Sequence, residues 1–209
     1  MSLDDLYFHK AIGYNFIGHY TPSQNQNFYK DLNECNKNIK ECNLCPLCKI
    51  RKSSVLIDTC EHKSINAKIV FVALMAYDGI NDDIDALKSL LGREFSNIYF
   101  SFLLKCITTR ARFENFIINN DINASIKPCK PYFDIEEKML KPKIIIALGA
   151  RVFQALMGES GYAYTSVRGG LYRLGNSLIM PTHDLVFLAK NPSLKCEIIA
   201  DLHKLKAFL

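Results

Sequence analysis

The sequence lacks the marks of several protein classes. No apolar run reaches the roughly 18 residues that a membrane-spanning helix needs. The N-terminal segment places Asp4 and Asp5 where a secretory signal peptide carries basic residues, so we expect a protein that is not exported and stays in the cytoplasm. The chain also has no internal repeats and no low-complexity segment. These absences favour an ordinary globular protein.

The composition and length fit one large domain. Of the 209 residues, 49% are hydrophobic and 22% are charged, which is enough apolar material for a sizeable core. The formal net charge of +5 permits an anionic partner without requiring one. We predict an N-terminal helical extension over residues 1–40 and a single domain over residues 41–209.

Four short apolar runs predict the strands of a sheet. They are rich in Ile, Val and aromatic residues and show little alternation, as strands do when both faces of a parallel sheet are covered. The runs are Ile69–Leu74, Ile98–Leu104, Lys143–Leu148 and Leu178–Pro181. Helical patterns lie between and after them, at Asp82–Leu91, Pro131–Leu140, Ala150–Met157 and from Ser193 onward.

Strands that alternate with helices predict an α/β fold. We expect a three-layer α/β/α sandwich with a central four-stranded parallel sheet. Ligands of such folds bind at the carboxyl ends of the strands, so the functional residues should lie just past those ends. The segments in that position are Met75–Gly79, Lys105–Arg112, Gly149–Arg151 and Thr182–Asp184.

Eight cysteines are the unusual feature of the sequence. A reducing cytoplasm disfavours disulfides, so the thiols indicate metal or cluster binding. Two residues separate Cys42 from Cys45, and two separate Cys45 from Cys48. This spacing directs neighbouring thiolates to one metal or cluster edge. Structural zinc usually needs a second close pair of ligands, which this sequence does not have. An iron–sulfur cluster is therefore favoured, with zinc and inert buried thiols as alternatives.

Five segments, taken in order, resemble the iron–sulfur uracil-DNA glycosylases (family 4 and its bacterial relatives). They are Cys42–Arg51 (CNLCPLCKIR), the run IVFVAL, the run IYFSFLLKC, Cys129–Gly158, and a C-terminal part with Val167–Gly170, LIMPTHD and Lys190–Pro192. The resemblance spans about residues 42–205 and implies a uracil-DNA glycosylase-like fold. It also implies a role in DNA base-excision repair, with single- or double-stranded DNA as the partner.

The resemblance further implies a [4Fe–4S] cluster. Its ligands would be Cys42, Cys45, Cys106 and Cys129. The cluster would be structural and would pin the N-terminal loop to the segment between the second and third strands. The interval from Cys106 to Cys129 is longer than the family pattern, and an insertion over Arg112–Ser125 accounts for the difference.

The expected base pocket departs from the family pattern. Leu74 stands where the family has a carboxylate, and Phe102 stands where it has an asparagine that reads the uracil edge. Neither side chain has a hydrogen-bond donor or acceptor. Tyr77 is positioned to stack on a flipped base, and Asp78 is the nearest acid that could replace the lost carboxylate.

The segment Thr182–Pro192 resembles the last family motif and keeps its length. On that register the family histidine falls on Asp184, and a slip of one residue would give its role to His183. A histidine past a strand end suits stabilisation of a leaving base anion. His183, Asp184 and Asp78 are therefore the predicted catalytic residues.

Basic residues beside the strand ends and the cysteines predict a DNA-binding face. The predicted contacts are Arg51, Lys105, Arg168, Gly169 and Lys190. The cations would bind phosphates, and Gly169 would let the backbone approach a phosphate closely.

Two functions follow from a preserved scaffold and an altered pocket. One is a DNA glycosylase that hydrolyses the N-glycosidic bond of a flipped damaged base. The other is a catalytically inactive [4Fe–4S] protein that binds DNA or recognises damage. The replacements at Leu74 and Phe102 disfavour uracil as the excised base. A zinc-stabilised interaction domain is a third alternative.

Overall fold

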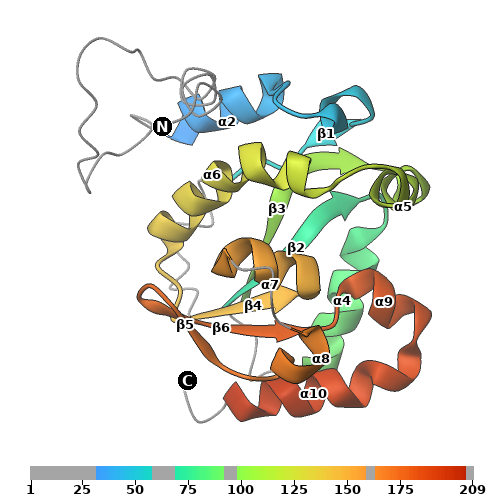
Figure 1. Ribbon diagram of the computed structural model, residues 1–209, viewed down its shortest axis with the longest axis vertical. Helices are drawn as coiled ribbons and strands as arrows, with labels where there is room; N and C mark the ends of the chain where they lie inside the picture. Colours follow the sequence, from blue (N-terminus) through green and yellow to red (C-terminus); the bar gives the residue numbers. More distant parts are fainter. Residues whose placement is uncertain (1–31, 58–68, 92–97, 159–162, 206–209) are drawn as a thin grey trace.

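A computed structural model of the chain describes residues 32–57, 69–91, 98–158 and 163–205. Residues 1–31, which make up most of the predicted N-terminal extension, lie outside the described residues, and so does Cys60. Within the described parts, one sheet runs through the molecule and helices pack on both of its faces (Figure 1).

The sheet has six strands in the order β1-β3-β2-β4-β6-β5. The four inner strands are mutually parallel and are β2 (Ile69–Tyr77), β3 (Ile98–Thr108), β4 (Ile144–Leu148) and β6 (Ser177–Thr182). One short antiparallel strand adds to each edge, β1 (Ser53–Ser54) beside β3 and β5 (Tyr172–Leu174) beside β6. The mixed α/β class agrees with the prediction, but the four-stranded sheet is wrong. Strands of two and three residues leave no hydrophobic pattern in a sequence.

Buried apolar side chains explain why the inner strands form. Every residue of β4 is buried, and so is every residue of β2 except Leu74. The register sets Ile69 beside Ile98 of β3 on one side and Ile144 of β4 on the other. Because β-branched residues pack well on a pleated surface, these strands form the centre of the hydrophobic core.

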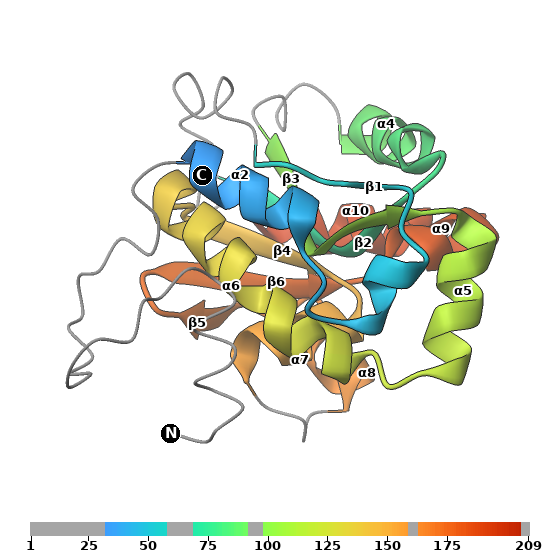
Figure 2. The same cartoon turned by 90° about the horizontal axis from the view of Figure 1, so that it is seen from above.

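Helices cover both faces of the sheet (Figure 2). The helices α6 (Asn123–Leu140) and α7 (Ala150–Met157) lie on one face, and α4 (Ile80–Leu91) and α10 (Lys195–His203) lie on the other. Alternate residues of β3 point to the two faces. Tyr99 contacts Glu136 of α6, whereas the ring of Phe100 lies 5.7 Å from Lys88 Nζ of α4.

The other helices connect or flank these layers. They are α2 (Leu32–Glu41), α5 (Arg110–Asn119), α8 (Tyr164–Val167) and α9 (Leu185–Lys190), with short 3-10 turns η1 (Pro46–Lys49) and η3 (Pro192–Leu194). Side-chain caps fix the start of two of them. Thr109 Oγ1 accepts from the backbone N–H of Arg112 at 3.2 Å, and Asp184 Oδ1 accepts from that of Phe187 at 2.7 Å.

Three predicted helices have other bounds in the structure. The helix expected from Asp82 begins two residues earlier, at Ile80. The helix expected from Pro131 begins at Asn123, with Pro128 and Pro131 accommodated inside it. The helix expected from Ser193 is divided into η3 and α10. No helix among the described residues is both long enough and apolar enough to cross a membrane.

The helix α2 packs against the domain instead of extending away from it. Cys35 and Ile39 are fully buried in the common core. The side chain of Asn36 makes two hydrogen bonds of 2.8 Å with the backbone of Ile57. The predicted boundary at residue 40 therefore falls inside α2, and residues 32–40 belong to the domain.

Candidate functional site

Five cysteines from three parts of the chain line one small cavity, which we call the thiol cavity. Cys42, Cys45 and Cys48 come from the segment between α2 and β1, Cys106 from β3 and Cys129 from α6. The volume of the cavity is about 10 Å³. The fold thus brings the four predicted ligands together and adds Cys48 to them.

Hydrogen bonds from the backbone and from Arg51 organise this region. The backbone N–H of Lys105 donates to Cys129 Sγ at 3.3 Å. The guanidinium of Arg51 donates to the carbonyl oxygens of Lys40 (2.7 Å) and Ile39 (3.3 Å). Arg51 therefore fastens the cysteine-bearing segment to the end of α2.

The thiols are close enough to affect one another electrostatically. Burial raises the pKa of Cys106 to about 11, and the charges of Cys45 and Cys42 add to this rise. Burial likewise raises the pKa of Cys129 to about 12, and here Cys106 and Cys42 add to it. Soft metals bind such sets of thiols by replacing their protons. Among the described residues, no group of three or more Cys, His, Asp or Glu side chains lies close enough to hold a single metal ion.

A buried ion pair lies beside the thiol cavity. The side chains of Lys105 and Glu136 are 3% and 2% exposed, and Nζ lies 2.6 Å from Oε2. Glu136 also accepts hydrogen bonds from Tyr99 Oη (2.7 Å) and from Ser101 Oγ. The ammonium group of Lys105 does not reach the surface, which conflicts with its predicted contact to DNA.

A second and larger cavity opens at the carboxyl ends of β2, β4 and β6; we call it the strand-end cavity. Its volume is about 350 Å³. The strands and the turns after them contribute mostly apolar side chains to its wall, among them Leu74, Met75, Tyr77 and Leu148. This is the edge of the sheet at which ligands of α/β proteins bind.

Helices complete the wall of the strand-end cavity, chiefly α5 and α7, with α4 and α9 also contributing residues. The helix α5 contributes Phe113, Glu114 and Ile117, and α7 contributes Arg151 in its first turn. Phe113 is buried and its ring is nearly parallel to that of Tyr77, with 6.4 Å between the ring centroids. The insertion predicted between Cys106 and Cys129 thus includes a helix that faces this cavity.

Ion pairs join the helices around the strand-end cavity. Glu114 Oε1 lies 2.9 Å from Lys190 Nζ of α9 and 3.6 Å from Arg110 Nε. The hydrogen bond from Lys190 is the main reason that the pKa of Glu114 is lowered, so its carboxylate is ionised at neutral pH. Arg110 also lies over the ring of Tyr77, whose hydroxyl donates to Asp83 at 2.5 Å.

Asp184 lines the strand-end cavity and also begins α9. Its Oδ1 atom accepts the hydrogen bond from Phe187 that caps the helix. Gly149 adopts a φ of +100° opposite it, and a Cβ atom on Gly149 would lie 3.1 Å from Asp184 Cβ. The two segments therefore approach so closely that this position requires glycine.

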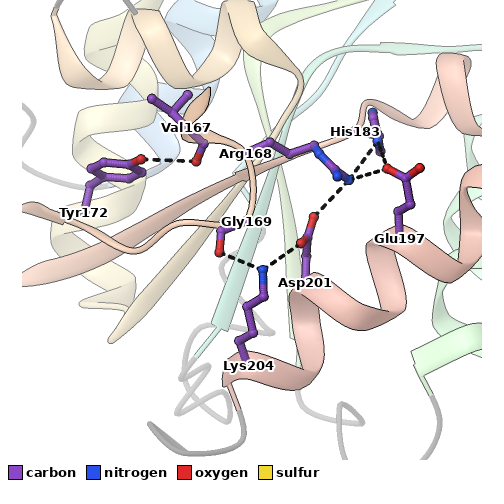
Figure 3. A network of polar contacts seen from close by, with 8 residues as sticks. All are labelled: Val167, Arg168, Gly169, Tyr172, His183, Glu197, Asp201 and Lys204. Atoms are coloured by element: carbon purple, nitrogen blue, oxygen red, sulfur yellow. Dashed lines mark hydrogen bonds and ion pairs between the residues drawn. The ribbon is translucent and has the colours of Figure 1, made fainter. Parts of the chain in front are cut away.

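His183 is held outside the strand-end cavity, although it adjoins Asp184. Figure 3 shows its ring directed at Arg168 and at Glu197 of α10. Nε2 lies 3.0 Å from a guanidinium nitrogen of Arg168 and 3.3 Å from Glu197 Oε2. Arg168 in turn lies 2.7 Å from Glu197 and 3.2 Å from Asp201. The structure thus separates His183 from Asp184, the two residues that the sequence offered for one catalytic role.

Gly169 is part of the same polar network (Figure 3). Its carbonyl oxygen accepts from Lys204 Nζ at 3.3 Å, and Lys204 also pairs with Asp201 at 3.1 Å. Gly169 has a φ of +68°, and an added Cβ would lie 2.3 Å from Asp201 Oδ1. Arg168 and Gly169 are therefore engaged by α10 in this structure, and both are predicted DNA contacts.

The remaining predicted site residues lie apart from the strand-end cavity. Asp78 is exposed and pairs with Lys52. Phe102 lies in a separate hollow on the α4 face, together with Phe100 and Ile84. Of the predicted pocket and catalytic residues, Leu74, Tyr77 and Asp184 meet at the strand-end cavity, whereas Tyr77, Asp78 and Phe102 meet at the hollow on the α4 face.

The sequence did not identify Phe113 and Glu114 as site residues. The sequence indicated this region only as an insertion relative to the family pattern. A helix without a recognisable motif gives no indication of function. Arg151 lies in a segment expected just past a strand end, but its part in the cavity depends on how α7 is oriented.

The similarity to known proteins is limited in extent. No family model matches the sequence. Over 127 residues the chain is 26% identical to a type-4 uracil-DNA glycosylase of Sulfurisphaera tokodaii. The match covers 57% of this chain and 54% of the relative, so the chain spans about half the length of that protein. This partial similarity agrees with the resemblance that the sequence motifs indicated.

Proposed function

We propose that this chain is a uracil-DNA glycosylase-like iron–sulfur protein of base-excision repair that binds DNA and takes a flipped base into the strand-end cavity. The observation that supports it most is this cavity itself, which has about 350 Å³ of mainly apolar space at the carboxyl ends of β2, β4 and β6. An apolar pocket with a few polar groups suits a planar base.

The thiol cavity supports the iron–sulfur part of the proposal. Cys42, Cys45, Cys106 and Cys129 would hold a [4Fe–4S] cluster, because all four line this one cavity. Cys48 lines the cavity too and is the alternative ligand to test. The cluster would tie the segment before β1 to β3 and α6.

Cations beside the strand-end cavity support DNA binding. Arg112 and Arg151 are exposed, and the Lys190 side chain is 58% exposed. All three belong to α5, α7 or α9, the helices that surround the cavity. Such residues would hold the phosphates that flank a flipped nucleotide. Affinity should then decrease linearly with salt on logarithmic axes.

A second function, binding without base excision, is favoured by one observation. His183 pairs with Arg168 and Glu197 instead of lining the cavity, and Leu74 offers no hydrogen bond inside it. The cavity therefore lacks, at these positions, both the histidine and the carboxylate that uracil excision was expected to use. A chain of this kind would protect or mark damaged DNA.

The test combines cluster analysis, DNA binding and base release. Protein purified without oxygen is assayed for iron and sulfide, then for binding to single- and double-stranded oligonucleotides that contain one uracil. Abasic sites are cleaved with alkali, and His183→Ala is compared with the native chain. Base release supports an active glycosylase. Salt-dependent binding without release supports the second function, and no binding at any salt concentration contradicts both.

A further inference from the structure

We infer that Glu114 and Arg151 are catalytic residues that replace the missing pocket groups: Glu114 deprotonates the attacking water and Arg151 stabilises the departing base. This inference rests on the proposed function, because it needs a base in the strand-end cavity. It assigns the chemistry to α5, which lies outside the five resembling segments, and to Arg151 of α7, which lies within one of them.

The position of Glu114 carries the first half of the inference. It lines the same cavity as Leu74, the residue that stands where a carboxylate was expected. Its side chain is 36% exposed, so water reaches it, whereas the base would lie against the apolar wall. Lys190 at 2.9 Å and Arg110 at 3.6 Å hold the carboxylate from two helices. A positioned, ionised carboxylate at the entrance of an apolar cavity is suited to accept a proton from water.

The position of Arg151 carries the second half. It lines the cavity in the first turn of α7, two residues after Gly149. Among the described residues, no carboxylate pairs with its guanidinium. Asp184 in the same wall already caps α9, and His183 is turned toward α10. A cation at the cavity wall that is not neutralised by a neighbouring carboxylate can stabilise a base that leaves with negative charge, once the bound nucleotide covers it.

The proposed step balances with water as the only co-reactant. The water oxygen attacks C1′ of the flipped nucleotide and forms a new C–O bond. The bond between C1′ and the base nitrogen breaks, and its electron pair leaves with the base. Glu114 takes one proton of the water and later returns it to the base anion, which Arg151 stabilises until then. The products are an abasic sugar and the free base.

The experiment measures base release separately from binding and base extrusion. Single-turnover rates are determined with oligonucleotides that contain uracil or hypoxanthine. DNA affinity is measured by anisotropy, and extrusion by the fluorescence of 2-aminopurine placed at the same position. We expect Glu114→Gln to lower the release rate by about 10²–10⁴-fold and Arg151→Met by about 10²–10³-fold, with extrusion retained. Glu41→Gln and Lys143→Met remove exposed charges elsewhere and should leave the rate unchanged.

A pH profile distinguishes a catalytic carboxylate from a structural one. Lys190, Arg110, Asp184, Arg151 and Tyr77 are the charged or titratable groups that surround Glu114. Removing the cation in Lys190→Met should move the acidic limb of the rate profile to higher pH, because Lys190 favours the ionised form. Release that persists in Glu114→Gln overturns the inference. The inference is also overturned if the native chain binds DNA and extrudes the base but releases neither uracil nor hypoxanthine. That result would still agree with the proposed DNA binding. Absence of binding refutes the proposed function itself.

Discussion

The thiol cavity and the strand-end cavity differ in how their side chains are held. Beside the thiol cavity, Lys105 and Glu136 are almost completely buried, and their contacts run through the core between β3 and α6. At the strand-end cavity, Glu114 and Lys190 form an ion pair that is largely open to solvent. The first region is thus part of the folding core, whereas the second can change its charged residues with little effect on stability. Stability and chemistry are separable in this fold, and four substitutions test this separation.

The largest effect is expected for Cys106→Ala. Loss of a proposed ligand should abolish most of the bound iron and give a colourless, unstable protein, because cluster binding and folding are coupled. Iron and sulfide analysis together with thermal unfolding measures both effects. Cys196→Ser, which changes an exposed thiol on α10, is the matched control and should keep its iron. A stable brown Cys106→Ala protein would contradict the ligand set.

The next largest effect is expected for Glu136→Leu. It leaves the buried ammonium of Lys105 without its partner, so we expect a loss of about 3–5 kcal/mol in the free energy of unfolding. Denaturant titration measures the change. The double variant Lys105→Met/Glu136→Leu should recover most of the loss, because a buried ion pair is often replaceable by apolar side chains. If the single variant is as stable as the native chain, the pair is not buried as described.

A smaller effect is expected for Gly169→Ala. The new methyl group meets Asp201 at a backbone conformation that disfavours side chains, and we expect a loss of about 2 kcal/mol. Gly158→Ala is the control, since it has a similar φ of +73° but no atom within 4 Å of the added Cβ. That variant should lose only about 1 kcal/mol, the cost of the backbone conformation. Equal losses would mean that α10 gives way to the methyl group.

The smallest effect on stability is expected for Lys190→Met. Exposed ion pairs contribute about 0.2–1 kcal/mol, so the variant should unfold almost as the native chain does. DNA affinity should nevertheless decrease, and the slope of its salt dependence should fall by about one if Lys190 binds a phosphate. A loss of several kcal/mol in stability would show that the strand-end cavity is part of the folding core after all.

The sequence predicted the scaffold better than the chemistry, for a physical reason. Long apolar runs such as Ile144–Leu148 have few structural solutions, so the inner strands could be located from their composition. The four cysteines expected to act together do line one cavity, since few residue types can serve as soft ligands. By contrast, carboxylates and cations occur throughout the surface. That Glu114 faces the strand-end cavity depends on the packing of α5, which no local pattern encodes.

The two edges of the sheet affect whether two copies of the chain can associate by strand pairing. The four parallel strands are strongly apolar, and β2 and β3 are also long. Long apolar strands favour strand addition and aggregation when an edge is open. In the described structure β1 and β5 stand outside them, with only two and three residues each and with the exposed Ser53 and Arg173 among them. In the described structure, however, β1 pairs only with Cys106 and Ile107 of β3, and β5 pairs only with Ser177, Leu178 and Ile179 of β6. These two short strands therefore shield one end of each edge of the apolar sheet from edge-to-edge association.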